Sequence, residues 1–105
     1  YTPLEAGALG VPSVTTDLAG FGRFFCNECA QKDPPGIYVL KRLNTKDEDV
    51  VNQLVDVMFN YMEFSKEERI ANMMEARKVA SMADWKSFVK NYIDAHNMAV
   101  DKVYK

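Results

Sequence analysis

Only two short runs in this chain have the pattern of a β-strand, and the sequence after the second run is helical in pattern to its end. Residues 11–16 are rich in β-branched side chains and are bounded by Pro12 and Asp17, which is typical of a strand. Residues 37–40 form a continuous apolar run after the break at residues 32–36. Such a run is typical of a strand buried in a parallel sheet.

A helical pattern precedes the first run and another separates the two. Residues 3–9 favour a helix, because Pro3 suits a first turn and Gly10 is placed to end it. A loop is expected over residues 17–22 and a short helix over residues 23–31. This order predicts part of a doubly wound α/β domain with two short parallel strands, near residues 13–16 and 37–40. A complete domain of that kind has about five or six strands, so we expect the sheet to be incomplete.

Three further helices are expected after the second strand. Thr45 with Glu48, and Ser65 with Glu68, each have the spacing of a capping box, in which two side chains satisfy free N–H groups at a helix start. A last helix is expected to begin around Asp84 and to continue to the end of the chain. Its apolar stripe repeats at helical spacing and comprises Trp85, Phe88, Val89, Tyr92, Ile93, His96, Val100 and Val103.

Apolar residues make up 48% of the chain, which is enough to fill a core. The six methionines are expected to fill gaps in that core, the alternative being an adaptable binding face. We expect Trp85 to anchor the core and His96 to pack within its stripe. The formal charge of -2 and the interrupted basic stretches argue against nucleic acid as a partner. No apolar run reaches the roughly 18 residues that span a membrane. A cytoplasmic protein is expected, because two reduced thiols fit that compartment.

Cys26 and Cys29 form a C-x-x-C pair. A zinc site would need a second pair of ligands, and the carboxylate of Glu28 between the two thiols disfavours a reactive thiolate. We interpret them as ordinary thiols. A redox pair and a metal site completed by another chain stay open as alternatives.

The start of the first helix is the part of the chain where chemistry is expected. The free N–H groups and the dipole of a helix start favour an anion such as a phosphate. Thr2 offers a hydroxyl at the N-cap position, and Glu5 follows three residues later. The alternative is a structural capping box made by these two side chains.

Four motifs, in order, resemble glycogen synthases of glycosyltransferase family 3. Residues 1–6, Y-T-P-L-E-A, followed by G-V-P-S-V at residues 10–14, look like the donor-site helix and next strand of retaining transferases with two Rossmann-like domains. Residues 12–22 are close to that family's P-S-V-T-T-N-L-S-G-F-G. Residues 36–39 match its G-I-Y-[IV], and residues 84–86 match its D-W-K.

The resemblance implies a fold, a reaction and a set of site residues. The fold would be a truncated Rossmann-like domain, the carboxy-terminal domain of a GT-B enzyme, and residues 84–105 would pack on an amino-terminal domain that is missing. Glu5 would be the second glutamate of an E-x7-E motif and contact the ribose of the donor. Tyr1 and Thr2 would cradle the diphosphate of UDP-glucose, with Tyr1 flanking the nucleotide.

The reaction implied is transfer of glucose from a nucleotide-glucose to the non-reducing end of glycogen or another α-1,4-glucan, with retention of configuration. No metal or cofactor is implied. Because the chain does not begin with Met and the first glutamate would lie before Tyr1, we interpret it as a piece of a longer protein. Alone it is expected to be inactive. It is also expected to self-associate, because Tyr92, Ile93, Val100 and Val103 would be left partly exposed without the amino-terminal domain.

One departure concerns residues 67–78, where animal and fungal members have an arginine-rich helix that senses glucose 6-phosphate. Only Arg69 and Lys78 hold matching basic positions, and a phosphate pocket needs several convergent cations. We therefore expect a bacterial-type enzyme. Two other functions stay open: a related transferase that uses a different nucleotide sugar, and a free-standing binding module.

Overall fold

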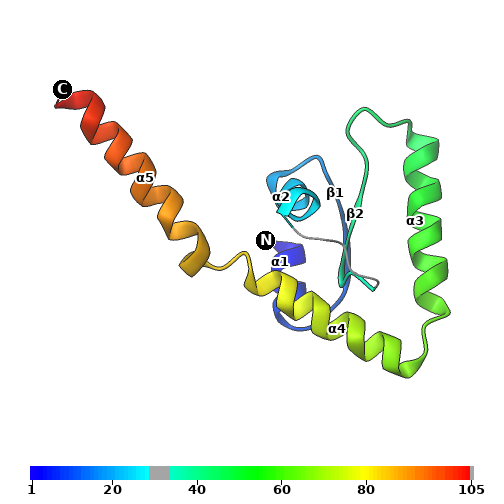
Figure 1. Ribbon diagram of the computed structural model, residues 1–105. Coiled ribbons are helices and arrows are strands. Elements are labelled where there is room, and N and C mark those ends of the chain that lie inside the picture. The colour runs from blue at the N-terminus through cyan, green and yellow to red at the C-terminus, as the bar shows by residue number, and fades with distance from the viewer. Residues whose placement is uncertain (29–33, 105) are drawn as a thin grey trace.

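The computed structural model describes residues 1–28 and 34–104. Helices dominate, and two short strands lie between them (Figure 1). The elements are α1 (Thr2–Ala8), β1 (Ser13–Thr16), α2 (Gly20–Glu28), β2 (Ile37–Leu40), α3 (Asp47–Met62), α4 (Lys66–Ser81) and α5 (Trp85–Val103). The predicted order of elements is confirmed.

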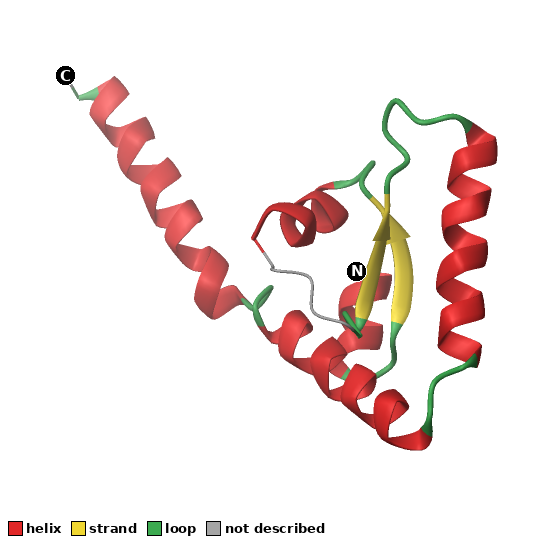
Figure 2. Cartoon of the chain, turned by 45° about the vertical axis from the view of Figure 1, so that its right-hand side comes forward, coloured by secondary structure: helices red, strands yellow, loops and turns green. Residues whose placement is uncertain are grey.

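The two strands pair in parallel, as predicted, and Ser13 lies opposite Ile37 while Thr16 lies opposite Leu40. Helices α1 and α2 lie on one side of the strands and α3 lies on the other, in both Figure 1 and Figure 2. A layer of helices on each face is the usual cover of a parallel sheet. The chain is therefore an α/β unit, rich in helix, with two parallel strands.

The core lies between α2, β2 and α4. Phe25, Ile37 and Val79 are buried, and the partly buried Phe21 and Phe24 pack against them. The rings of Phe21 and Phe24 meet the ring of Phe25 edge-on, with centroids 4.5 and 5.1 Å apart. These edge-to-face pairs lie within α2 and add to its hydrophobic burial. The packing of Phe25 with Ile37 and Val79 is what attaches α2 to β2 and α4.

Small side chains let α4 approach α1 and the start of β2 closely. Asn72, Ala76 and Ala80 are almost completely buried and repeat every four residues, so they share one face of α4. A Cβ atom added to Gly7 of α1 would lie 2.9 Å from the Cβ atom of Ala80. Gly36 has φ 76° and lies against the backbone of Ala76. This contact places α1 beside the sheet.

Asn72 is the fully buried polar residue of this contact. Its Oδ1 atom accepts a hydrogen bond from the N–H of Gly36 at 2.7 Å, and its Nδ2 atom donates to the hydroxyl of Tyr38 at 3.3 Å. A buried amide is stable only when its polar atoms are satisfied. Asn72 therefore ties the middle of α4 to the start of β2.

Helix α5 projects away from the rest of the chain (Figures 1 and 2). The ring of Phe88 meets the ring of Phe24 with centroids 5.2 Å apart, close to the start of α5. Beyond that point the stripe is exposed, and Val103 is 72% exposed. The radius of gyration is 16.9 Å, against about 13 Å for a compact domain of this length.

Several local predictions are wrong. Helix α2 begins at Gly20, inside the expected loop, whereas the strand predicted near residues 13–16 is confirmed. The end predicted for α2, residue 31, lies outside the described residues. Helix α3 begins at Asp47 with Lys46 as its N-cap, and no side chain caps it. The hydroxyl of Thr45 donates to the carbonyl oxygen of Leu43 instead, because the backbone has not yet turned into the helix.

Burial was also predicted wrongly for several large side chains. Trp85 is 65% exposed and His96 is exposed, so neither belongs to the core. The six methionines are exposed as well, which contradicts a role as core filler within this chain. Their exposed fractions are 57% for Met58, 72% for Met62, 45% for Met73, 66% for Met74, 40% for Met82 and 61% for Met98. The physical reason is that no element within residues 1–28 and 34–104 covers the faces of α3, α4 and α5 on which these side chains lie.

Candidate functional site

The first turn of α1 is open to solvent. Tyr1 is the N-cap residue, and its carbonyl oxygen accepts the first helical hydrogen bond from the N–H of Glu5 at 2.8 Å. No side chain caps this turn. Thr2 already lies inside the helix and not at the N-cap position as predicted, and the alternative, a capping box of Thr2 and Glu5, is therefore absent. The free N–H groups of a helix start remain available to a ligand.

Tyr1, Thr2 and Glu5 all lie on this turn and are exposed. The side chain of Tyr1 is 91% exposed and lines two adjoining grooves. Thr2 and Glu5 are not among the lining residues of either groove. The structure thus brings the three predicted residues onto one turn, but it directs only Tyr1 towards a concave surface.

The smaller groove, of about 410 Å³, joins the starts of α1 and α2. It is lined by Tyr1 and Leu4 from α1, and by Gly20 and Phe21 from the start of α2. In the sequence these two helix starts are about twenty residues apart. Helix α1 precedes β1 in the chain and α2 follows it, so the start of each helix lies at the same edge of the open sheet. Ligands of open α/β folds bind at that edge.

The larger groove, of about 780 Å³, lies between α1, the end of α4 and the start of α5. The rings of Trp85 and Tyr92 lie in it with centroids 5.4 Å apart. The other lining residues are Tyr1, Leu4, Ala8, Arg77, Ala80, Ser81, Ala83, Asp84, Phe88 and Asn91. Sequence reasoning missed this groove, although the aromatic residues spaced along the first two turns of the last helix are a signal that could have indicated it.

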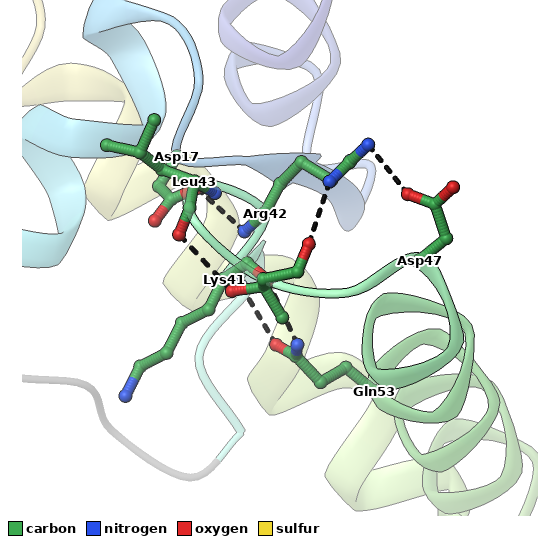
Figure 3. A network of polar contacts seen from close by, with 7 residues as sticks. Asp17, Lys41, Arg42, Leu43, Asp47 and Gln53 are labelled. Carbon is green, nitrogen blue, oxygen red and sulfur yellow. Dashed lines mark hydrogen bonds and ion pairs between the residues drawn. The ribbon is translucent and has the colours of Figure 1, made fainter.

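A network of polar contacts fixes the loop between β2 and α3 at the same edge of the sheet (Figure 3). The Oδ1 atom of Asp17 accepts hydrogen bonds from the N–H groups of Arg42 and Leu43, at 2.8 and 2.9 Å. The side-chain amide of Gln53 pairs with both the N–H and the carbonyl oxygen of Lys41. Arg42 reaches Asp47 of α3 at 2.7 Å.

These contacts also act on the charge of Asp17. The hydrogen bonds from the N–H groups of Leu43 and Arg42 hold the pKa of the carboxyl group below its ordinary value, because they stabilise the ionised form. Arg23 adds a smaller effect in the same direction. Asp17 was identified from the sequence only as the boundary of a strand, and the structure shows it as the residue that joins two loops.

The cysteine interpretation stays a prediction, because Cys29 lies outside the described residues and so does the side chain of Cys26. Within the described ranges, 1–28 and 34–104, no group of three or more His, Cys, Asp or Glu residues is placed to hold a metal ion. In the same part of the chain, no helix combines the length and apolar character needed to span a membrane.

Comparison with known proteins identifies the family. The sequence profile of the family described as glycogen synthase matches residues 1–105. A glycogen (starch) synthase of Neurospora crassa is 34% identical over 104 residues, 99% of this chain and 15% of the relative. The liver glycogen (starch) synthase of Homo sapiens is 30% identical over the same share of each chain. That of Caenorhabditis elegans is 31% identical over 99% of this chain and 16% of the relative.

These relatives are all eukaryotic, so they lend no support to the expected bacterial type. The chain spans about 15% of the length of the curated relatives it matches. The match covers the whole chain, from residue 1 at the start of α1, through both strands, to the last helix. The chain belongs to the glycogen synthase family.

Proposed function

We propose that the protein containing this chain transfers glucose from a nucleotide-glucose donor, UDP-glucose in the first instance, to the non-reducing end of an α-1,4-glucan such as glycogen. The configuration of the transferred glucose is retained. This chain is then part of the nucleotide-sugar-binding, carboxy-terminal domain of a GT-B enzyme, a Rossmann-like domain. The observation that carries the proposal is the uncapped start of α1 beside the groove, in a chain of the glycogen synthase family.

The roles of three residues follow from this proposal. Tyr1 and Thr2, at the start of α1, bind the diphosphate through free backbone N–H groups, and the ring of Tyr1 flanks the nucleotide. Glu5 accepts hydrogen bonds from the ribose hydroxyls. The position of Glu5 one turn into the helix, exposed on the same turn as Thr2, supports this assignment because ribose and diphosphate are adjacent groups of one donor.

The proposed reaction requires stabilisation of the diphosphate leaving group. As the bond between glucose and the diphosphate breaks, the sugar becomes oxocarbenium-like and negative charge grows on the diphosphate. The partial positive charge of a helix start and its fixed N–H donors stabilise that charge, and they do so best in a cleft that excludes water. The other wall of the cleft and the acceptor-binding groups belong to the rest of the protein, so this chain alone has no transferase activity.

The end of α5 is proposed to pack on the amino-terminal domain of the same protein. Its exposed stripe, from Tyr92 to Val103, supports this, because an apolar face of that length normally has a covering partner. The bacterial type is also a proposal. Arg69 lies over the ring of Tyr61 at 5.3 Å and is nine residues from Lys78, or about 13 Å along α4, so these two cations do not converge on one phosphate.

The proposal is tested in the full-length enzyme by replacing Glu5. The variant Glu5→Ala is expected to raise the KM for UDP-glucose by about tenfold or more and to lower turnover, because hydrogen bonds to a charged group are lost. The matched control is Glu67→Ala, which removes an exposed glutamate from the first turn of α4. Replacing Cys26 and Cys29 together with serine is the second control, and both controls are expected to leave the kinetics unchanged.

Three results decide among the alternatives. Wild-type turnover with a different nucleotide sugar but none with any nucleotide-glucose would show a related transferase. A Glu5→Ala variant with unchanged donor KM would remove Glu5 from the donor site. Activation of the wild-type enzyme by glucose 6-phosphate would contradict the bacterial type.

A further inference from the structure

Asp17, the first residue after β1, has hydrogen bonds to three separate parts of the chain. Its N–H donates to the carbonyl oxygen of Leu40 at 3.1 Å, which extends the parallel ladder by one residue. Its Oδ1 atom accepts from the consecutive N–H groups of Arg42 and Leu43 (Figure 3). Its carbonyl oxygen accepts from the Nε atom of Arg23, in α2, at 2.9 Å. The N–H, the carbonyl oxygen and the Oδ1 atom of Asp17 are therefore all used to join elements.

The loop that Asp17 holds is itself firmly attached to α3. The two hydrogen bonds between Gln53 and the backbone of Lys41 are 2.8 and 3.0 Å long. The guanidinium group of Arg42 donates to the carbonyl oxygen of Thr45 at 3.0 Å and pairs with Asp47. The N–H groups of residues 42 and 43 therefore point in one fixed direction. Because Asp17 accepts hydrogen bonds from both, this loop holds the turn that begins at Asp17 in place.

On its other side, Asp17 opens the turn that leads into α2. Gly22 lies against the backbone of Thr16, at a distance that only glycine allows, so the first turn of α2 is pressed onto the end of β1. Gly20 and Phe21 then line the smaller groove together with Tyr1. The direction of the turn at residues 17–19 therefore decides where this wall of the groove lies relative to the start of α1.

We propose that Asp17 is a positioning residue for nucleotide-sugar binding: by accepting hydrogen bonds from the N–H groups of residues 42 and 43, it fixes the turn that brings Gly20 and Phe21 into the groove that Tyr1 also lines. This inference rests on the proposed function. Asp17 lines neither groove, so its proposed effect on the donor is indirect. The geometry requires one oxygen with two lone pairs, which an amide supplies as well as a carboxylate. The family motif quoted above has Asn at this position, which offers the same oxygen.

The test uses the full-length enzyme with three substitutions at one position. Asp17→Ala is expected to raise the KM for UDP-glucose about tenfold, because two N–H groups lose their acceptor, while the KM for the glucan stays unchanged. Asp17→Glu keeps the charge but displaces the oxygen, and it is expected to raise the donor KM as well. Asp17→Asn keeps the oxygen and is expected to stay within about twofold of wild type.

A control on the same loop separates positioning from general loop stability. Asp47→Asn breaks the ion pair with Arg42 from the α3 side, where the Asp47 side chain is 87% exposed. It is expected to change the donor KM by less than about twofold, since exposed ion pairs contribute little. Amide hydrogen exchange of residues 42 and 43 gives a readout without activity: protection is lost in Asp17→Ala and Asp17→Glu and kept in Asp17→Asn and Asp47→Asn.

Four outcomes would overturn the inference. An unchanged donor KM in Asp17→Ala, or in Asp17→Glu if the alanine variant does not fold, removes Asp17 from substrate positioning. Equal losses in Asp17→Asn and Asp17→Ala show that the charge matters and not the acceptor oxygen. Equal rises in donor and glucan KM show general destabilisation. Absence of turnover by the wild-type enzyme with any nucleotide-glucose overturns the proposed function, and this inference falls with it.

Discussion

At the scale of single residues, a close backbone contact decides how α4 lies against the start of β2. Gly36 has a positive φ, which glycine adopts readily, and it lies against the backbone of Ala76. Asn72, one turn earlier in α4, holds the N–H of Gly36. A contact between two backbones leaves no flexible side chain that could move aside, so the position tolerates no larger residue.

We therefore expect Gly36→Ala to destabilise the chain by about 2 kcal/mol or more, since strain at φ and a steric clash act together. The measurement is the urea midpoint of unfolding. Gly20→Ala is the matched control, because nothing lies within 4 Å of its added Cβ atom. It should change the free energy of unfolding by about 0.5 kcal/mol or less, and any change should be an increase, because alanine favours a helix more than glycine does. Similar losses of stability in both variants would contradict a steric clash with the backbone of Ala76 as the cause.

At the scale of elements, two identical sequence patterns have different outcomes. At α4 the capping box is complete: the hydroxyl of Ser65 accepts from the N–H of Glu68, and the Glu68 carboxylate accepts from the N–H of Ser65. At α3 the same spacing at Thr45 and Glu48 yields no cap. The loop before α3 is held by Asp17 and Gln53, and these contacts place Thr45 outside the helix.

This difference predicts unequal effects of two alanine substitutions. Ser65→Ala should lower the free energy of unfolding by about 1 kcal/mol, the usual value for loss of an N-cap. Thr45→Ala should cost clearly less, about 0.5 kcal/mol at most, because only a local bond to a carbonyl oxygen is lost. Thermal or chemical unfolding of both variants side by side decides the matter, and an equal loss would mean that Thr45 caps α3 in solution.

At the scale of the whole molecule, the chain is not a closed body. Its largest extent is 60 Å, and α5 accounts for the projection in Figure 1. Tyr92, Ile93 and Val100 are each slightly more than half exposed. The predicted exposure of this stripe is confirmed, whereas the identity of its cover, the amino-terminal domain, stays a prediction.

We expect the isolated chain to self-associate at micromolar concentration, because an uncovered apolar helix face lowers its free energy by pairing. Sedimentation velocity measures this directly. Val100→Glu should weaken the association, while Ser87→Glu adds the same charge to the opposite side of α5 and should not. A monomer at every concentration would show that the exposed stripe does not drive pairing.

The amino-acid sequence by itself determined the order of the elements, the parallel strand pair, the last helix and the family. Those features depend on patterns within a few residues, such as the apolar run at 37–40 and the D-W-K at 84–86. Only the tertiary structure decided which apolar faces are covered, why Thr45 caps nothing and how Asp17 joins two loops. Burial and long-range hydrogen bonds depend on which other segment of the chain packs against a residue. The residue spacing and helix or strand propensity within one segment do not identify that other segment.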